Sequence, residues 1–224
     1  MYKLYSKTFL ALLFVVTALL YQPTFAADNY KVGDKLYVAP TAGINIRSRP
    51  SLQAPILAKL NYNTAVTVAA DSLPAEPLQV RVKDFNEGFM TLQGHWVKVK
   101  SGRITGYVFD GMLSSVKGLE LNNYQEEAYF ADTFGKPRKE TIQKSKVVEG
   151  HKADSETVIT THPKGIVVEY TFFDGCHDLT YTFDIPFNDV YWLINRMMVG
   201  ADAVQDVKIR KEGKRTVLTY YSCT

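Results

Sequence analysis

The chain has 224 residues, with 26 basic and 23 acidic side chains and a formal net charge of +3. Lysine and arginine are spread along the whole sequence without a block, so the basic patch typical of nucleic-acid-binding proteins is missing. A chain of this length forms one large domain or two small ones, and composition alone does not choose between them.

The N-terminal 26 residues have the three parts of a secretory signal peptide. Lys3 and Lys7 precede an apolar run over 9–20. A cleavage site with small residues, Thr-Phe-Ala at 24–26, follows this run. The alternative is an uncleaved membrane anchor, but an anchor needs about 18 to 20 apolar residues, and the helix breaker Pro23 follows this shorter run. We expect cleavage after Ala26, which removes two lysines and leaves a nearly neutral, soluble protein that is exported to the periplasm or secreted.

Short alternating segments with turn residues between them dominate 34–113. Small β-barrels have this pattern of brief strands separated by Gly, Pro, Asn and Ser clusters. Residues 85–93 are expected to be a loop or part of a hairpin. The expected strands are 35–39, 44–46, 56–60, 65–68 and 78–82, followed by strands around 96–99 and 106–108.

Three sequence motifs of this region together resemble one known module. Residues 44–51 read Ile-Asn-Ile-Arg-Ser-Arg-Pro-Ser, and the chain continues with Trp-Val-Lys-Val at 96–99 and Gly-Tyr-Val at 106–108. Over about 35–114 the chain is similar to the bacterial Src homology 3 family, whose modules fold as small barrels of five to six strands. Arg49 stands where that family usually has glycine, and 71–94 resembles an insertion.

The resemblance implies an SH3-like barrel domain over 30–115 that recognises peptidoglycan or other envelope peptides. Aromatic faces supply contact area and arginine pairs with carboxylates, which gives a set of candidate ligand-binding residues. The competing interpretation is structural: turn-forming roles near 47–50 and packing of the aromatic rings in the barrel. The candidate residues are Tyr37, Arg47, Arg49, Trp96 and Tyr107.

A second domain is expected over 119–224, after a short linker at 114–118. Leu179, Tyr181 and Phe183 alternate with threonines, a pattern typical of a sheet with one buried and one wet face. Further strands are expected at 141–149, 156–161, 165–173, 207–210 and 216–221, with a brief helix near 124–130.

One segment of this second domain has helical spacing. Val190, Leu193, Ile194 and Met197 recur on one face until Gly200, and the polar start at 188–189 suits a helix N-terminus. The fold class is therefore mainly β: a small SH3-like barrel followed by an α+β domain with an antiparallel sheet and one main helix.

The two cysteines, Cys176 and Cys223, both lie in the expected second domain. In an exported chain such a pair predicts a disulfide. The alternative makes Cys176 a nucleophile beside His177, but adjacent side chains of an extended segment point in opposite directions.

No other arrangement of residues indicates catalysis. The four histidines lack the spacing of metal ligands, and the sequence has no glycine-rich phosphate loop and no nucleophile elbow. We therefore expect a protein without metal or cofactor that binds cell-wall peptide or an envelope protein, with no nucleic-acid partner and no stable membrane insertion. Two alternatives stay open: an inhibitor or immunity-like protein acting through the second domain, and a wall hydrolase with the barrel as its targeting module.

Overall fold

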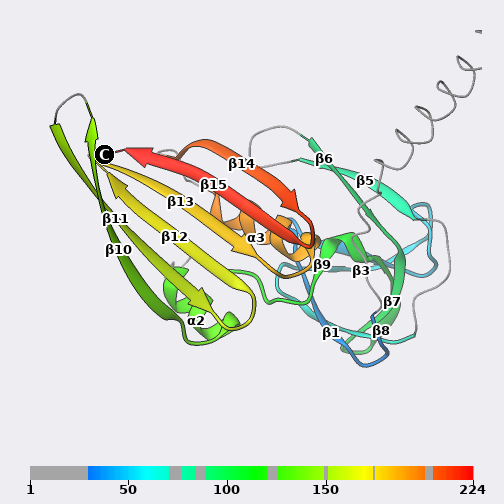
Figure 1. The fold of residues 1–224 in the computed structure, drawn as a ribbon. Helices are drawn as coiled ribbons and strands as arrows, with labels where there is room; N and C mark the ends of the chain where they lie inside the picture. The colour runs from blue at the N-terminus through cyan, green and yellow to red at the C-terminus, as the bar shows by residue number, and fades with distance from the viewer. Residues whose placement is uncertain are drawn as a thin grey trace, which may run out of the picture.

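The computed structural model describes residues 30–70, 77–83, 89–120, 126–148, 151–173, 175–199 and 204–223. The expected signal peptide at 1–26 lies outside these residues. The described part of the chain forms an SH3-like sheet, a small hairpin and a larger sheet with two α-helices (Figure 1). Neither helix in these ranges has the length and apolar character needed to cross a membrane.

The first sheet, called here the barrel sheet, has seven strands in the order β3-β2-β8-β7-β4-β1-β9. Neighbouring strands are antiparallel, and the 3₁₀ turn η1 (Asp110–Met112) precedes the last strand. The strands are β1 (Lys35–Val38), β2 (Ile44–Arg47), β3 (Ile56–Leu60), β4 (Ala65–Val68), β7 (Trp96–Ser101), β8 (Ile104–Phe109) and β9 (Leu113–Ser114).

Alternating apolar side chains fill the inside of the barrel sheet, as the sequence predicts. Val99 and Val108 are both fully buried and belong to one core cluster with Ile46. At Gly106 the backbone of β8 passes very close to β2. A Cβ atom at this position would lie only 2.5 Å from the carbonyl oxygen of Arg47. The close approach that glycine permits at this position is therefore needed to hold the two strands together.

The expected insertion at 71–94 contains a separate hairpin, β5 (Leu78–Lys83) and β6 (Phe89–Gly94). Its buried Leu92 packs with Phe109 of the barrel sheet and Tyr191 of the second helix. The described part of this insertion thus contacts both halves of the molecule. For 85–93 the sequence predicts either a loop or part of a hairpin, and β6 shows that its described residues belong to a hairpin strand.

The second sheet, called here the large sheet, has six antiparallel strands in the order β10-β11-β12-β13-β15-β14. Helices α2 (Glu126–Phe134) and α3 (Phe187–Met197) pack on the same face of it (Figure 1). The strands are β10 (Arg138–Val148), β11 (His151–His162), β12 (Ile166–Phe173), β13 (Cys176–Phe183), β14 (Val204–Glu212) and β15 (Arg215–Cys223).

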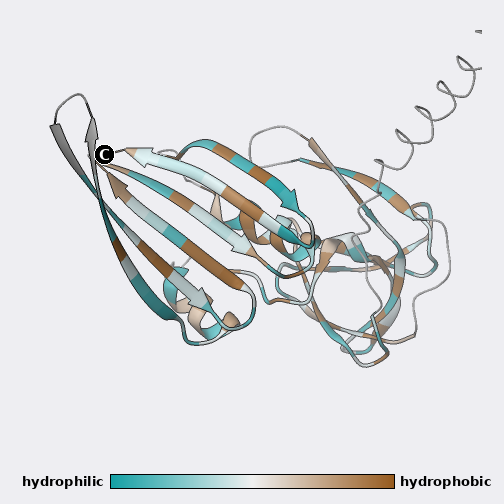
Figure 2. Cartoon of the chain, viewed as in Figure 1, coloured by the Kyte–Doolittle hydropathy of each residue, from teal (hydrophilic) through white to brown (hydrophobic). Residues whose placement is uncertain are grey.

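Hydropathy alternates along the strands of the large sheet (Figure 2). Tyr181 and Phe183 are buried under the helices, whereas Thr180 and Thr182 on the other face stay partly exposed. The sheet therefore has the buried and wet faces that the sequence predicts. Cys176 and Cys223 are cross-strand partners of β13 and β15 and form a disulfide.

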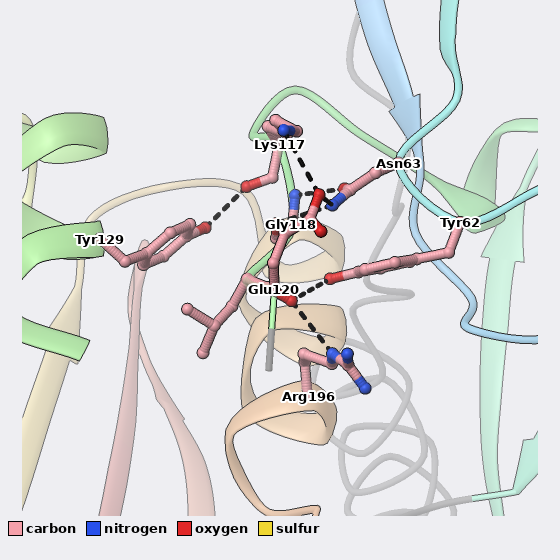
Figure 3. Close-up of polar contacts among 8 residues, drawn as sticks. Tyr62, Asn63, Lys117, Gly118, Glu120, Tyr129 and Arg196 are labelled. Carbon is pink, nitrogen blue, oxygen red and sulfur yellow. Dashed lines mark hydrogen bonds and ion pairs between the residues drawn. The ribbon is translucent and has the colours of Figure 1, made fainter. Parts of the chain in front are cut away.

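The expected linker at 114–118 is held by hydrogen bonds on both sides. Its neighbour Leu119 accepts, through its carbonyl oxygen, bonds from Tyr62 Oη (2.8 Å) and Arg196 Nε (3.0 Å) (Figure 3). Asn63 donates to the carbonyl of Gly118 (2.9 Å) and accepts from its N–H (2.7 Å). The segment is thus a fixed junction between the barrel sheet and α3.

Helix α3 adds a second set of contacts to this junction. Trp192 Nε1 donates to the carbonyl of Gly111 at 2.9 Å, and Asp189 accepts from the backbone N–H of Ser115 at 3.0 Å. The apolar side of α3 meanwhile packs on the large sheet through Val190 and Ile194. A single helix therefore contributes to the packing of both halves of the protein.

Candidate functional site

Four side chains form a continuous row across the outer face of the barrel sheet. Strand pairing puts Ile56 opposite Arg47, Arg47 opposite Tyr107, and Tyr107 opposite Lys98. This set, called the outer row, crosses β3, β2, β8 and β7 at one level. Ile56 is 54% exposed, and the other three are half-buried. The row thus combines one aliphatic, one phenolic and two cationic side chains.

Contacts within the barrel orient the cations of the outer row. Arg47 Nη1 donates a 2.8 Å hydrogen bond to the carbonyl of Ala54, which ties the guanidinium to the turn before β3. Lys98 Nζ lies 5.9 Å from the centre of the Tyr107 ring, within the range of a cation–π contact. Such an arrangement presents positive charge beside an aromatic surface, which suits a ligand that carries a carboxylate.

The structure brings only some of the candidate residues together. Arg47 and Tyr107 are direct cross-strand neighbours, and Trp96 lies one position further along the same face of β7, opposite Phe109. Arg49 is exposed just beyond the end of β2.

Tyr37 stands apart from these residues. It lies on β1 opposite Ala65 and Ser114, where Lys35 Nζ is 5.3 Å from its ring. The barrel therefore separates Tyr37 from the nearest strand of the outer row, β7, by one intervening strand, β4.

The sequence interpretation missed Ile56 and Lys98 as members of this surface. Both occupy outward positions of strands whose alternation was visible, but only the strand order places them beside Arg47 and Tyr107. Leu52 and Leu57 nearby in the sequence are also well exposed and add apolar surface around the β2–β3 turn. Exposed aliphatic side chains grouped in this way are typical of contact surfaces.

Charge distinguishes the two halves of the protein. Residues 30–115 contain ten lysines and arginines against six acids, a net charge of +4, whereas residues 116–224 contain 14 bases against 16 acids, a net charge of −2. The outer row therefore lies on the positive half of the molecule. A negatively charged ligand is attracted to this half before it makes any contact.

Two buried carboxyl groups lie at the junction. Burial raises the pKa of Asp110 to about 7, although the backbone N–H groups of His95 and Gly111 oppose the rise by donating to it. Burial also raises the pKa of Asp189, against hydrogen bonds from Ser114 and Ser115. These carboxyls are enclosed and bonded to backbone, so they fix the junction and are not exposed to a ligand.

The described residues offer no constellation for metal or thiol chemistry. Within them no three His, Cys, Asp or Glu side chains converge in a way that could hold a metal ion. The sulfur of Cys176 is bonded to Cys223, which removes the alternative of a thiolate nucleophile beside His177. His162 is buried with its Nδ1 2.8 Å from the carbonyl oxygen of Gly135, so it ties α2 to β11.

Comparison with known families identifies the first domain. The sequence profile of the bacterial SH3 domain matches residues 42–114, which include Arg47, Trp96 and Tyr107. This part of the chain is a bacterial SH3 domain, a class of module that indicates binding to material of the cell wall or envelope. Together with the disulfide, it indicates an extracellular location. Searches of the curated proteins and of the solved structures found no match to the chain.

Proposed function

We propose that the protein is an exported binding or scaffolding protein of the cell envelope. Residues 1–26 direct export, the SH3-like domain at 30–115 recognises peptidoglycan or envelope peptides, and the α+β domain at 119–224 acts beside it in the periplasm or outside the cell. The observation that carries the proposal is the outer row, in which two cations flank the half-buried phenol of Tyr107 on a bacterial SH3 domain.

The chemistry of the outer row fits a short peptide with a free carboxylate. Arg47 can pair with the carboxylate in a bidentate manner, and its guanidinium is already oriented by Ala54. Tyr107 offers an aromatic face at little cost in conformational entropy, and Ile56 adds apolar contact area. Trp96 and Arg49 are proposed as flanking contacts, while Tyr37 would contribute only to a separate surface on β1.

The test is retention of the mature chain, residues 27–224, on purified peptidoglycan sacculi. We expect Lys98→Glu and Tyr107→Ala each to reduce retention at least tenfold, because each removes one element of the outer row. Lys35→Glu is the matched control, since it makes the same charge change on β1, away from the row. The proposal fails if sacculi retain the protein no better than a charge-matched unrelated protein, or if the two charge reversals weaken retention equally.

A further inference from the structure

The large sheet and helix α2 enclose a groove of about 710 Å³. It lies in the second domain, on the face that α2 and α3 only partly cover, and it shares no lining residue with the outer row. Its lining is mainly aromatic and aliphatic, with a few polar groups. The residues used below are Glu126, Phe130, Val158, Tyr170, Tyr181 and Tyr220.

Strand register fixes the floor of the groove. One row of cross-strand partners runs Val158, Tyr170, Leu179 and Tyr220, across β11, β12, β13 and β15. Three strand spacings give this row a length of about 14 Å. Tyr181 lies in the adjacent row, next to Val168. The floor is therefore a broad surface in which tyrosines alternate with aliphatic residues.

Helix α2 supplies the wall and its charge. Tyr181 Oη donates a 2.5 Å hydrogen bond to Glu126 Oε1 at the first turn of the helix, and lies 3.2 Å from Tyr220 Oη. The rings of Tyr181 and Tyr220 stack with their centres 5.9 Å apart, and Phe130 approaches Tyr181 at 6.1 Å. A carboxylate and three aromatic rings thus meet at one end of the groove.

The electrostatics of this end favour a cation. Burial raises the pKa of Tyr181, and it raises the pKa of Tyr220 to about 12. The negative charge of Glu126 adds to the rise in both cases. Both phenols therefore stay protonated, and Glu126 lies close enough to affect both of them. The neighbouring Glu127 forms an ion pair with Lys139 at 3.3 Å. The ammonium group of Lys139 is therefore already paired, on the outer side of the wall. An anionic ligand would face both glutamates of the wall.

We infer that this groove binds a peptide segment bearing a primary ammonium side chain, of the lysine type, beside an apolar residue. Aromatic faces within about 6 Å of a cation attract it, and Glu126 offers a charge-assisted acceptor at the same place. The aliphatic floor residues Val158 and Leu179 would cover the apolar neighbour.

The open end of the groove favours a chain over a small free amine. The next row of cross-strand partners contains Phe172 and His177, whose rings lie 5.2 Å apart, and Phe172 is 45% exposed. Tyr170 Oη is hydrogen-bonded to His177 Nδ1, which links this row to the floor. A peptide could therefore continue from the groove over Phe172 toward the edge of the molecule.

The first test uses three acetylated, amidated tripeptides with the mature chain: Ala-Lys-Leu, the uncharged analogue with norleucine in place of lysine, and Ala-Glu-Leu. Amide NMR shifts report where each peptide binds. We expect the lysine peptide to shift signals around Thr160, Leu179 and Tyr220, with at least tenfold weaker binding of the other two. Equal binding of the norleucine or glutamate peptide, or shifts confined to the barrel sheet, would overturn the inference.

The second test uses variants. Glu126→Gln keeps an acceptor for Tyr181 but removes the charge, and should weaken the lysine peptide at least fivefold. Thr219→Ala is the matched control, because Thr219 precedes Tyr220 on β15 and faces the opposite side of the sheet. Unchanged affinity in the Glu126→Gln protein would refute the role of the carboxylate. Retention on sacculi should be the same in both variants, so failure here and failure of the outer row can be told apart.

Discussion

The side-chain amide of Asn188, at the start of α3, donates a 2.6 Å hydrogen bond to the backbone carbonyl of Leu113 in β9. The two residues belong to opposite halves of the molecule, and Asn188 is 1% exposed. The bond therefore holds α3 against the barrel sheet in a place that water does not reach.

Replacing Asn188 by alanine should lower the free energy of unfolding by about 1 to 3 kcal/mol, because the carbonyl of Leu113 stays buried without this donor. Urea unfolding followed by tryptophan fluorescence measures it, since Trp192 lies at the same junction. Asn195→Ala removes a bond within the same helix and should change stability by less than about 0.5 kcal/mol. Equal effects of the two substitutions would contradict the role of the junction bond.

Asp110 should make the protein less stable as the pH rises from about 4 to about 7. Burial raises its pKa in the folded protein to about 7 from an ordinary value of 3.8, so the folded state binds the extra proton between these values. This contribution to stability is complete below about pH 4, partly lost at pH 5 and absent at pH 8. Asp110→Asn should reduce the difference in unfolding free energy between pH 5 and pH 8 by about 3 kcal/mol. Parallel pH profiles of the two proteins would show that Asp110 does not titrate in this range.

The disulfide should contribute strongly to the stability of the large sheet. Cys176 and Cys223 are 47 positions apart, and closing a loop of this size stabilises a fold by about 4 kcal/mol in the chain-entropy treatment. Replacing both cysteines by alanine should lower the unfolding free energy by that amount in a calorimetric or urea experiment. Reduction of the unmodified protein should produce the same loss, and a loss below about 1 kcal/mol in both cases would be inconsistent with this account.

Gly106→Ala should destabilise the barrel sheet by about 1 to 3 kcal/mol, the usual effect of forcing an extra methyl group into a packed site. The new Cβ would meet the carbonyl oxygen of Arg47 at 2.5 Å and Ile46 Cγ1 at 2.8 Å, so β2 and β8 must separate. Thermal unfolding measures the loss, with Thr105→Ala at the neighbouring exposed position as the control. Because Arg47 pairs with Tyr107 across the same two strands, retention on sacculi should fall together with stability.

Local patterns in the sequence predict the elements better than their partners. The alternation around Tyr181 and Phe183 correctly predicts one buried and one wet face of the large sheet, because residue spacing alone determines which side chains share a face. Strand β11 begins at His151, whereas the sequence predicts a strand only from residue 156, because most of the residues before it are polar. Pairing with β10 extends this strand, and a neighbouring strand is not visible in the local sequence.

The junction and the groove depend on contacts between distant residues. Asn188 and Asp189 resemble an ordinary helix start, yet their side chains bond to Leu113 and Ser115, 75 and 74 positions earlier. Glu126 resembles a solvated helix residue, yet it accepts a hydrogen bond from Tyr181, 55 positions later. Neither relationship leaves a periodic pattern, so the candidate groove could not be found from the sequence.

Because Tyr191 of α3 covers Leu92 and Phe109 of the first half, the bacterial SH3 domain of this protein is not an interchangeable unit. A chain shortened after the barrel would leave these two apolar side chains facing water and would tend to self-associate. Evolutionary transfer of the module to another protein would therefore require a substitute for α3 or a new polar surface at the same place.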